Sequence, residues 1–330
     1  MATATRRISP TISIFLGRQF VASFLLIFAL FIGIILAIDL IELLRRAASK
    51  QEATFDLVLS MAIYKLPLTA QKTLPFAVLF GGLQTPVSLA IVPFVNQMKV
   101  PFMGPWAAGT PITKNGAKEN YVFRVSAMDE LVDVALVERA MKIHGAKKPG
   151  MILINNPWGE SNEKGLKAAL ETKGLPNAGV EKVEQSAIDV VPQLTRLKEA
   201  GADTLFMVAN VGPSAQVIKS LERMKWDVPV VSHWGPSGGR FSELAGPAGE
   251  RVEMIQTFTF SGNSSPKAKD MMAKLMKRFP EIKGPADVTP AVGIANAYDA
   301  MHLTALAIKN AGSTEGPAIR QGFYDIKEYD

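Results

Sequence analysis

FGGLQTP, residues 80–86, marks the point where this sequence of 330 residues changes character. Before it, apolar runs are long enough to cross a bilayer. After it, short apolar runs alternate with amphipathic ones, as in α/β proteins. Two domains of one chain are normally joined by a polar linker, but here the apolar run 74–80 leads directly into the next part. The sequence therefore raises the hypothesis that two unrelated pieces are joined end to end.

Charge and composition exclude several functions. Of the net charge of +6, the first 82 residues contribute +4, from eight Lys/Arg and four Asp/Glu. Basic residues beside an apolar run set membrane orientation. No basic stripe with interleaved aromatics follows, so nucleic acid is not an expected partner. The chain has no cysteine, which excludes disulfides, thiolate zinc sites and cysteine nucleophiles.

Residues 1–82 are predicted to be a membrane segment. The uncharged run 20–38 is longer than the core of a signal peptide and continues into the amphipathic stretch 39–46. We expect one transmembrane helix over about 12–44, at which membrane lipid would be a partner. A second one, over 55–82, contains Lys65, Lys72 and prolines, and an interfacial helix is the alternative there.

This segment contains four short motifs in order, which are 18–20 (RQF), 38–42 (IDLIE), 65–67 (KLP) and 74–81 (LPFAVLFG). With them the segment resembles the first two membrane helices of the lipopolysaccharide export permeases, which belong to an ABC transporter. Such permeases need further helices and a periplasmic β-domain, which do not follow in this sequence.

The sequence after residues 80–86 predicts strands alternating with helices, which favours parallel sheets covered by helices on both faces. In such folds, ligands bind beyond the carboxyl ends of the strands. Strands are expected near 100–104, 121–126, 151–154, 180–187, 205–208, 228–231 and 252–260. Helices are expected at 129–145, 159–173, 191–200, 213–225, 266–278 and 290–311.

Catalytic chemistry is not indicated. His144, His233 and His302 are far apart and have no metal-ligand spacing. The glycine-rich stretch 235–239 lacks the Lys-Ser/Thr pair of a phosphate loop, so it is interpreted as a turn. No enzyme activity, metal or other cofactor is predicted. Binding remains, because tryptophans occupy the expected loops 106–110, 157–159 and 233–235. Aromatic walls with hydroxyls suit a small polar ligand, and loop-anchoring aromatics are the alternative.

The later part of the chain contains five motifs in order, which are 85–90 (TPVSLA), 100–102 (VPF), 121–126 (YVFRVS), 201–203 (GAD) and 297–300 (AYDA). With them, residues 83 to about 324 resemble the branched-chain amino acid type of periplasmic binding protein, which delivers ligands to the membrane subunits of an ABC importer. The resemblance implies a type I fold of two α/β lobes that close on the ligand. It also implies that the ligands are amino acids or related small polar or carboxylate molecules.

The resemblance also implies binding residues. It places Thr85 at a helix N-terminus that holds the ligand carboxylate, and Ala107 to Thr110 in a loop with further contacts. The usual hydroxyl there is assigned to either Ala108 or Thr110. The position that often carries an acidic partner for the ligand ammonium falls near Ser237. This departure leaves open a short-chain amide, a carboxylate or an aromatic acid. The candidates are Thr85, Ala107, Ala108, Gly109, Thr110, Trp158, Trp234 and Ser237.

The resemblance also implies that residues 83–330 are an incomplete binding-protein region. About three strand–helix units that normally precede Thr85 are replaced by the membrane segment, so the first lobe is expected to be incomplete. The second lobe is expected at about 129–249. With one spanning helix in the bacterial inner membrane this region would be periplasmic, and with two it would be cytoplasmic. The alternatives are a permease fragment with an unrelated tail, or a non-functional fusion artefact.

Overall fold

The computed structural model describes residues 80–329 except 264. The predicted helix over 12–44 lies outside these residues, as does the one over 55–82 except for its last three residues. Those three are not helical, because Phe80 forms a parallel bridge to Met103 and Gly82 has a φ of +85°. The compact unit therefore begins at Phe80, three residues before the expected boundary. Within the described residues no helix is long and apolar enough to cross a membrane.

The first lobe is built on a pair of parallel strands. β1 (Phe102–Gly104) pairs with β2 (Val122–Arg124), with Phe102 opposite Val122. α3 (Thr85–Met98) precedes β1, and the 3₁₀ turn η1 (Thr110–Ile112) lies between the strands. The chain returns to this lobe through α10 (Ala291–Ala311), which contacts β1 and packs on α11 (Gly316–Tyr324). In the part of the chain that the structure describes, this sheet has two strands.

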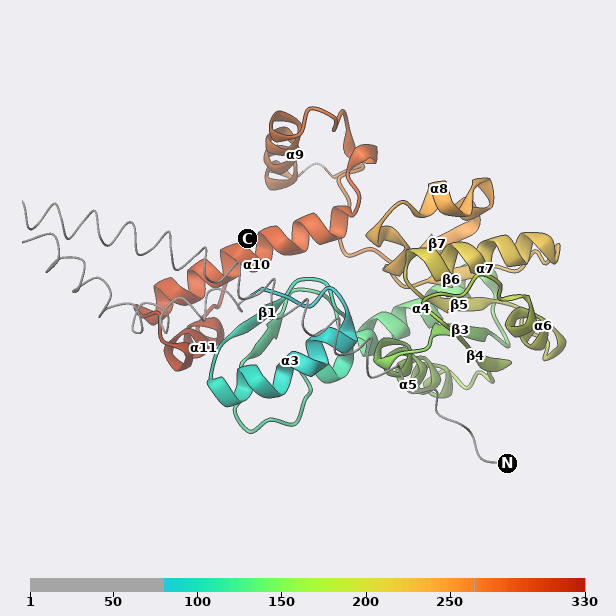
Figure 1. Ribbon diagram of the computed structural model, residues 1–330, viewed down its shortest axis with the longest axis horizontal. Coiled ribbons are helices and arrows are strands. Elements are labelled where there is room, and N and C mark those ends of the chain that lie inside the picture. The colour runs from blue at the N-terminus through green and yellow to red at the C-terminus, as the bar shows by residue number, and fades with distance from the viewer. Residues whose placement is uncertain (1–79, 264, 330) are drawn as a thin grey trace, which may run out of the picture. The chain divides into compact units, whose positions relative to one another are not determined.

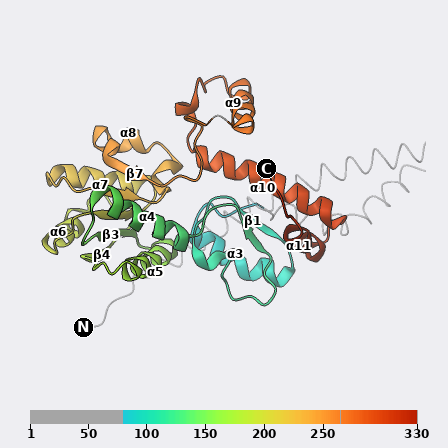
Figure 2. The same cartoon turned by 180° about the vertical axis from the view of Figure 1, so that it is seen from behind.

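The second lobe holds a parallel sheet in the order β4-β3-β5-β6-β7. Helices α5 and α7 lie on opposite sides of this sheet (Figures 1 and 2). The elements in chain order are α4 (Asp129–His144), β3 (Gly150–Ile154), α5 (Pro157–Thr172), β4 (Gly179–Val183), α6 (Val191–Glu199), β5 (Leu205–Val208), α7 (Val211–Arg223), β6 (Val230–Ser232), η2 (Gly235–Gly238), α8 (Phe241–Ala245), η3 (Pro247–Arg251) and β7 (Val252–Met254).

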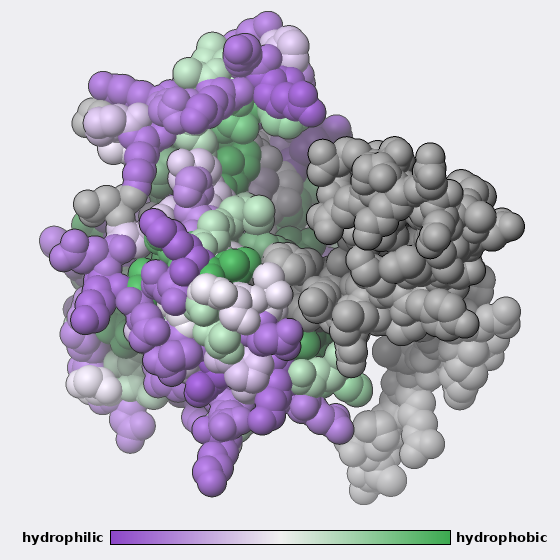
Figure 3. Space-filling model, turned by 90° about the vertical axis from the view of Figure 1, so that its left-hand side faces the viewer, coloured by the Kyte–Doolittle hydropathy of each residue, from purple (hydrophilic) through white to green (hydrophobic). Residues whose placement is uncertain are grey.

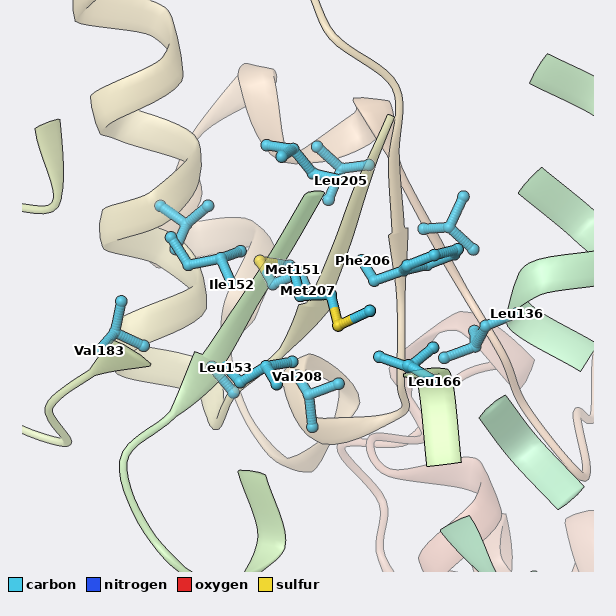
Figure 4. Packing of buried hydrophobic residues seen from close by; sticks show 14 of the residues in the cluster. Leu136, Met151, Ile152, Leu153, Leu166, Val183, Leu205, Phe206, Met207 and Val208 are labelled. Carbon is cyan, nitrogen blue, oxygen red and sulfur yellow. The ribbon is translucent and has the colours of Figure 1, made fainter. Parts of the chain in front are cut away.

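The core of this lobe explains why the sequence alternates as it does. The central strands β3 and β5 are buried along their whole length, because helices cover both faces of the sheet. Their side chains meet Leu136 from α4 and Leu166 from α5 (Figure 4). The predicted parallel α/β alternation is therefore confirmed for this lobe.

The structure differs from the predicted elements in several places. β4 ends at Val183 and β7 at Met254, both shorter than expected. Trp158 lies in the first turn of α5 and not in a loop, because Asn156 caps that helix and Pro157 begins it. The glycine-rich stretch expected to be a turn forms η2.

A connecting segment links the second lobe back to α10. It contains α9 (Pro266–Arg278) and η4 (Pro285–Asp287). On the face drawn in Figure 3, hydrophilic side chains predominate and hydrophobic ones form small scattered groups.

The loops that follow the carboxyl ends of β1, β3, β5 and β6 lie close enough together to line one cleft.

Candidate ligand-binding cleft

A cleft with about 310 Å³ of free space, counting the part open to solvent, lies where the two lobes meet. The first lobe contributes the start of α3 and the loop after β1. The second contributes the segments after β3, β5 and β6, as expected for ligand sites at strand carboxyl ends. None of the lining residues carries a charge; they are Leu83, Gln84, Thr85, Pro86, Trp106, Ala107, Ala108, Asn156, Trp158, Asn210 and Trp234.

Thr85 is fixed at the first position of α3. Its side chain is buried, and its Oγ1 accepts a hydrogen bond of 3.1 Å from the Gly109 N–H. A hydroxyl that accepts one hydrogen bond keeps its own proton to donate to another acceptor. The N-cap residue Gln84 makes no side-chain hydrogen bond to the helix, and the first N–H groups of a helix have no partner within it. This end of α3 is therefore suited to an anion.

The backbone of Gly109 packs closely against the side chain of Thr85. A Cβ atom added at Gly109 would lie 2.3 Å from Thr85 Cγ2, so only glycine allows this approach. The hydroxyl of Thr85 is consequently held by close packing and by one hydrogen bond. Gly109 itself does not line the cleft.

Arg124 holds the loop after β1 from behind. Its guanidinium donates to the Ala108 carbonyl at 2.8 Å, the Gly109 carbonyl at 2.9 Å and Thr113 Oγ1 at 2.7 Å. Burial lowers the pKa of Arg124 to about 10, against the opposing effect of Asp129 and Glu130. The side chain is therefore still charged at neutral pH, and its hydrogen bonds fix the loop conformation.

A buried cluster of polar groups positions the aromatic walls. Asp129 Oδ1 accepts from Trp158 Nε1 and from His233 Nε2, both at 3.1 Å. His233 Nδ1 accepts from the Trp234 N–H at 2.9 Å, so the ring is the neutral tautomer that carries its proton on Nε2. Asp129 and His233 are completely buried. The carboxylate thus ties together the residues that carry both indoles.

Five of the eight residues predicted from sequence line this cleft: Thr85, Ala107, Ala108, Trp158 and Trp234. Gly109 lies directly behind them. Thr110 lies outside the cleft, because its Oγ1 accepts from the Glu130 N–H and its own N–H donates to Ser161. Ser237 lines a different cavity and donates its hydroxyl to the Trp234 carbonyl at 2.7 Å.

The other six lining residues were not among the eight predicted; they are Leu83, Gln84, Pro86, Trp106, Asn156 and Asn210. The amide of Asn156 accepts from the N–H groups of Trp158 and Gly159, and that of Asn210 donates to Gln185 at 2.7 Å. An Asn followed by Pro after a buried strand is an N-cap signal, so Asn156 could have been placed next to Trp158. Among the described residues, no cluster of His, Asp or Glu could hold a metal ion.

Comparison with known families identifies the fold. A family model described as periplasmic binding protein matches residues 76–330. The chain belongs to the periplasmic binding protein family. A model of the lipopolysaccharide export system permease LptF/LptG matches only residues 14–90, so the two matches overlap over residues 76–90. The periplasmic binding protein match includes all of residues 80–86.

Similar proteins agree with this assignment. A Leu/Ile/Val-binding protein homolog of Brucella melitensis is 21% identical over 75% of this chain. The chain spans 64% of the length of that relative. A type 1 periplasmic binding protein of Bordetella pertussis has a TM-score of 0.70 at 22% identity, covering 76% of this chain and 70% of the other.

Two further structures contain ligands. An isoleucine complex of a branched-chain amino acid binding protein from Streptococcus pneumoniae has a TM-score of 0.65 at 19% identity, covering 79% of this chain and 74% of the other. A benzoate complex of a solute-binding protein from R. palustris has a TM-score of 0.64 at 17% identity, covering 78% and 70%. These likenesses confirm the α/β type I fold with parallel sheets.

Proposed function

We propose that this chain is the ligand-binding component of an ABC importer and that its ligand is a small carboxylate without an ammonium group. One observation carries the proposal: Thr85, three tryptophans and the N-terminus of α3 form an uncharged cleft between the lobes. A helix N-terminus attracts a carboxylate, and aromatic walls favour an apolar body.

The absence of charge in the lining favours acids over amino acids. An α-amino acid brings an ammonium group, and burying that group without an acidic partner is costly. Ser237, which falls near the usual acidic position, is neutral and lies in another cavity. The benzoate complex of a similar protein supports an aromatic acid as a ligand. The isoleucine complex supports a ligand with a branched aliphatic body as the alternative.

Family membership also supports a partner and a location. Periplasmic binding proteins deliver ligands to ABC membrane subunits, and we propose such subunits as the partners of this chain. We also propose that its binding-protein part lies in the periplasm. Attachment through residues 1–82 stays a prediction. The permease match stops at residue 90, and the described fold from Phe80 onward is that of a binding protein. For that reason lipopolysaccharide export is not proposed as the function.

The hydroxyl of Thr85 provides the test. In Thr85→Val the shape is kept, but the carboxylate loses a donor and the Gly109 N–H loses its acceptor. We expect benzoate affinity to fall by about 10- to 100-fold, since a hydrogen bond to a charged group is worth about 1.5–3 kcal/mol. Thr85→Ser keeps the hydroxyl and is the matched control. The measurement is calorimetric titration of the full chain in mild detergent. Equal benzoate affinity of the Thr85→Val variant and the unchanged protein would reject the proposal.

A further inference from the structure

A second cavity lies beside the candidate cleft and has about 740 Å³ of free space, counting the part open to solvent. Neutral polar side chains line much of it, and no lining residue is charged. The polar ones are Ser237, Ser242, Gln256, Thr259 and Thr289, and the large apolar ones are Phe241, Met254 and Phe258. This lining is suited to hydroxyl and amide groups that carry no charge.

Trp106 lies between the two cavities. Its indole lines the candidate cleft and meets Trp234 in a T-shaped arrangement with ring centres 6.4 Å apart. A Cβ atom added at Gly293 would lie 3.0 Å from Trp106 Cζ3, and one added at Gly238 would lie 3.5 Å from Cζ2. The ring therefore packs against backbone from both η2 and α10.

These two glycines lie next to residues that line the second cavity. Gly238 lies between Ser237 and Gly239, which both line it. The Cβ atom added at Gly293 would be 2.9 Å from Pro290 Cγ, and Pro290 is a lining residue as well. The indole thus lines the uncharged cleft and packs on two glycines whose neighbours line the polar cavity.

We propose that Trp106 is the wall that limits ligand length, and that it keeps the neutral hydroxyl or amide part of a longer carboxylate out of the second cavity. The inference rests on the proposed function, which places the ligand carboxylate at Thr85. With the indole present, the ligand ends at Trp106. Without it, roughly nine non-hydrogen atoms of space open toward Ser237, enough for an added amide and methylene group.

A pair of probe ligands tests the wall. Benzoate is compact, whereas hippurate has a neutral amide and one methylene between ring and carboxylate. The full chain should bind benzoate more tightly than hippurate. In Trp106→Ala the ratio of the two affinities should shift toward hippurate by at least about tenfold, while Trp106→Phe should shift it less. Trp226→Ala, which removes an indole packed beside Lys198 away from both cavities, should leave the ratio unchanged.

A second measurement needs no ligand. Gly293→Ala should lower Tm by about 2–6 °C when Trp106 is present, because its methyl group meets both the indole and Pro290. In Trp106→Ala the same change should lower Tm clearly less, since only the contact with Pro290 remains and alanine is otherwise favoured over glycine in a helix. Equal effects in both backgrounds would overturn the wall, as would benzoate binding with an unshifted ligand ratio. If Gly293→Ala lowers Tm less in the Trp106→Ala background but the protein does not bind benzoate, the position of Trp106 is supported and the proposed function is rejected.

Discussion

Replacing Gly109 by alanine tests the packing that positions Thr85. The backbone of Gly109 has a φ of −45°, which alanine adopts without strain, so the effect comes from the added methyl group alone. That group would lie 2.3 Å from Thr85 Cγ2 and 3.0 Å from Oγ1. Because carbon atoms pack at about 3.5–4.0 Å, Thr85 must move by about 1 Å or more.

The magnitude follows from this overlap. Overpacking of this kind costs about 1–3 kcal/mol, and the reduced entropy of the unfolded chain returns about 0.4–1 kcal/mol. The net loss of about 1–2 kcal/mol corresponds to a Tm lower by about 2–8 °C in a domain of this size. Displacing the Thr85 hydroxyl should also weaken benzoate binding by about 10- to 100-fold.

Thermal unfolding followed by circular dichroism and calorimetric titration give the two readouts. Gly212→Ala is the matched control, because a Cβ atom there meets nothing within 4 Å. The double variant Gly109→Ala with Thr85→Ser removes Cγ2, the atom in closest contact, and should recover most of both losses. Unchanged Tm and affinity in Gly109→Ala, or no recovery in the double variant, would refute this account of the site.

Two further changes test the buried polar groups on α4 and α5. Burial, and then Asp129, raise the pKa of Asp133 well above its usual value, so folding takes up a proton above about pH 4 and wild-type stability falls as pH rises toward the folded pKa. The free energy of unfolding of Asp133→Asn relative to wild type, measured in urea titrations, should therefore increase by about 1.4 kcal/mol per pH unit from about pH 4.5 up to the folded pKa. The same difference for Glu138→Gln, at an exposed position of α4, should lack this rise. A difference for Asp133→Asn that does not change with pH would contradict a raised pKa of Asp133. Trp158→Phe removes the indole N–H that donates to Asp129 and should cost about 1–3 kcal/mol in thermal unfolding; wild-type stability in this variant would show that the hydrogen bond contributes nothing.

The sequence predicted the second lobe well because its signals are local. Runs such as Met151–Ile154 and Leu205–Val208 are buried strands wherever helices cover both faces of a sheet. The lengths of β4 and β7 were less predictable, because pairing ends at Val183 and Met254, although Ile255, Phe258 and Phe260 continue a strand-like pattern past β7. Pairing depends on the neighbouring strand and not on the segment itself.

The candidate site was predicted only in part, for a similar reason. The resemblance placed Thr85 correctly at the start of a helix, since the Thr-Pro pair is itself a helix-start signal. Trp106 was seen as one more loop aromatic, because its contacts with Gly238 and Gly293 come from residues more than 130 positions away. Asp129 looked like an ordinary residue at a helix start, and its two buried hydrogen bonds depend on how α5 and β6 are placed.

The most direct test of the central claim compares two ligands that differ only in an ammonium group. Leucine and 4-methylpentanoate have the same branched body and carboxylate, so a calorimetric titration of the full chain with each isolates the effect of that charge. The uncharged lining predicts that 4-methylpentanoate binds at least about tenfold more tightly than leucine. Tighter binding of leucine would contradict a site built for a carboxylate without an ammonium group.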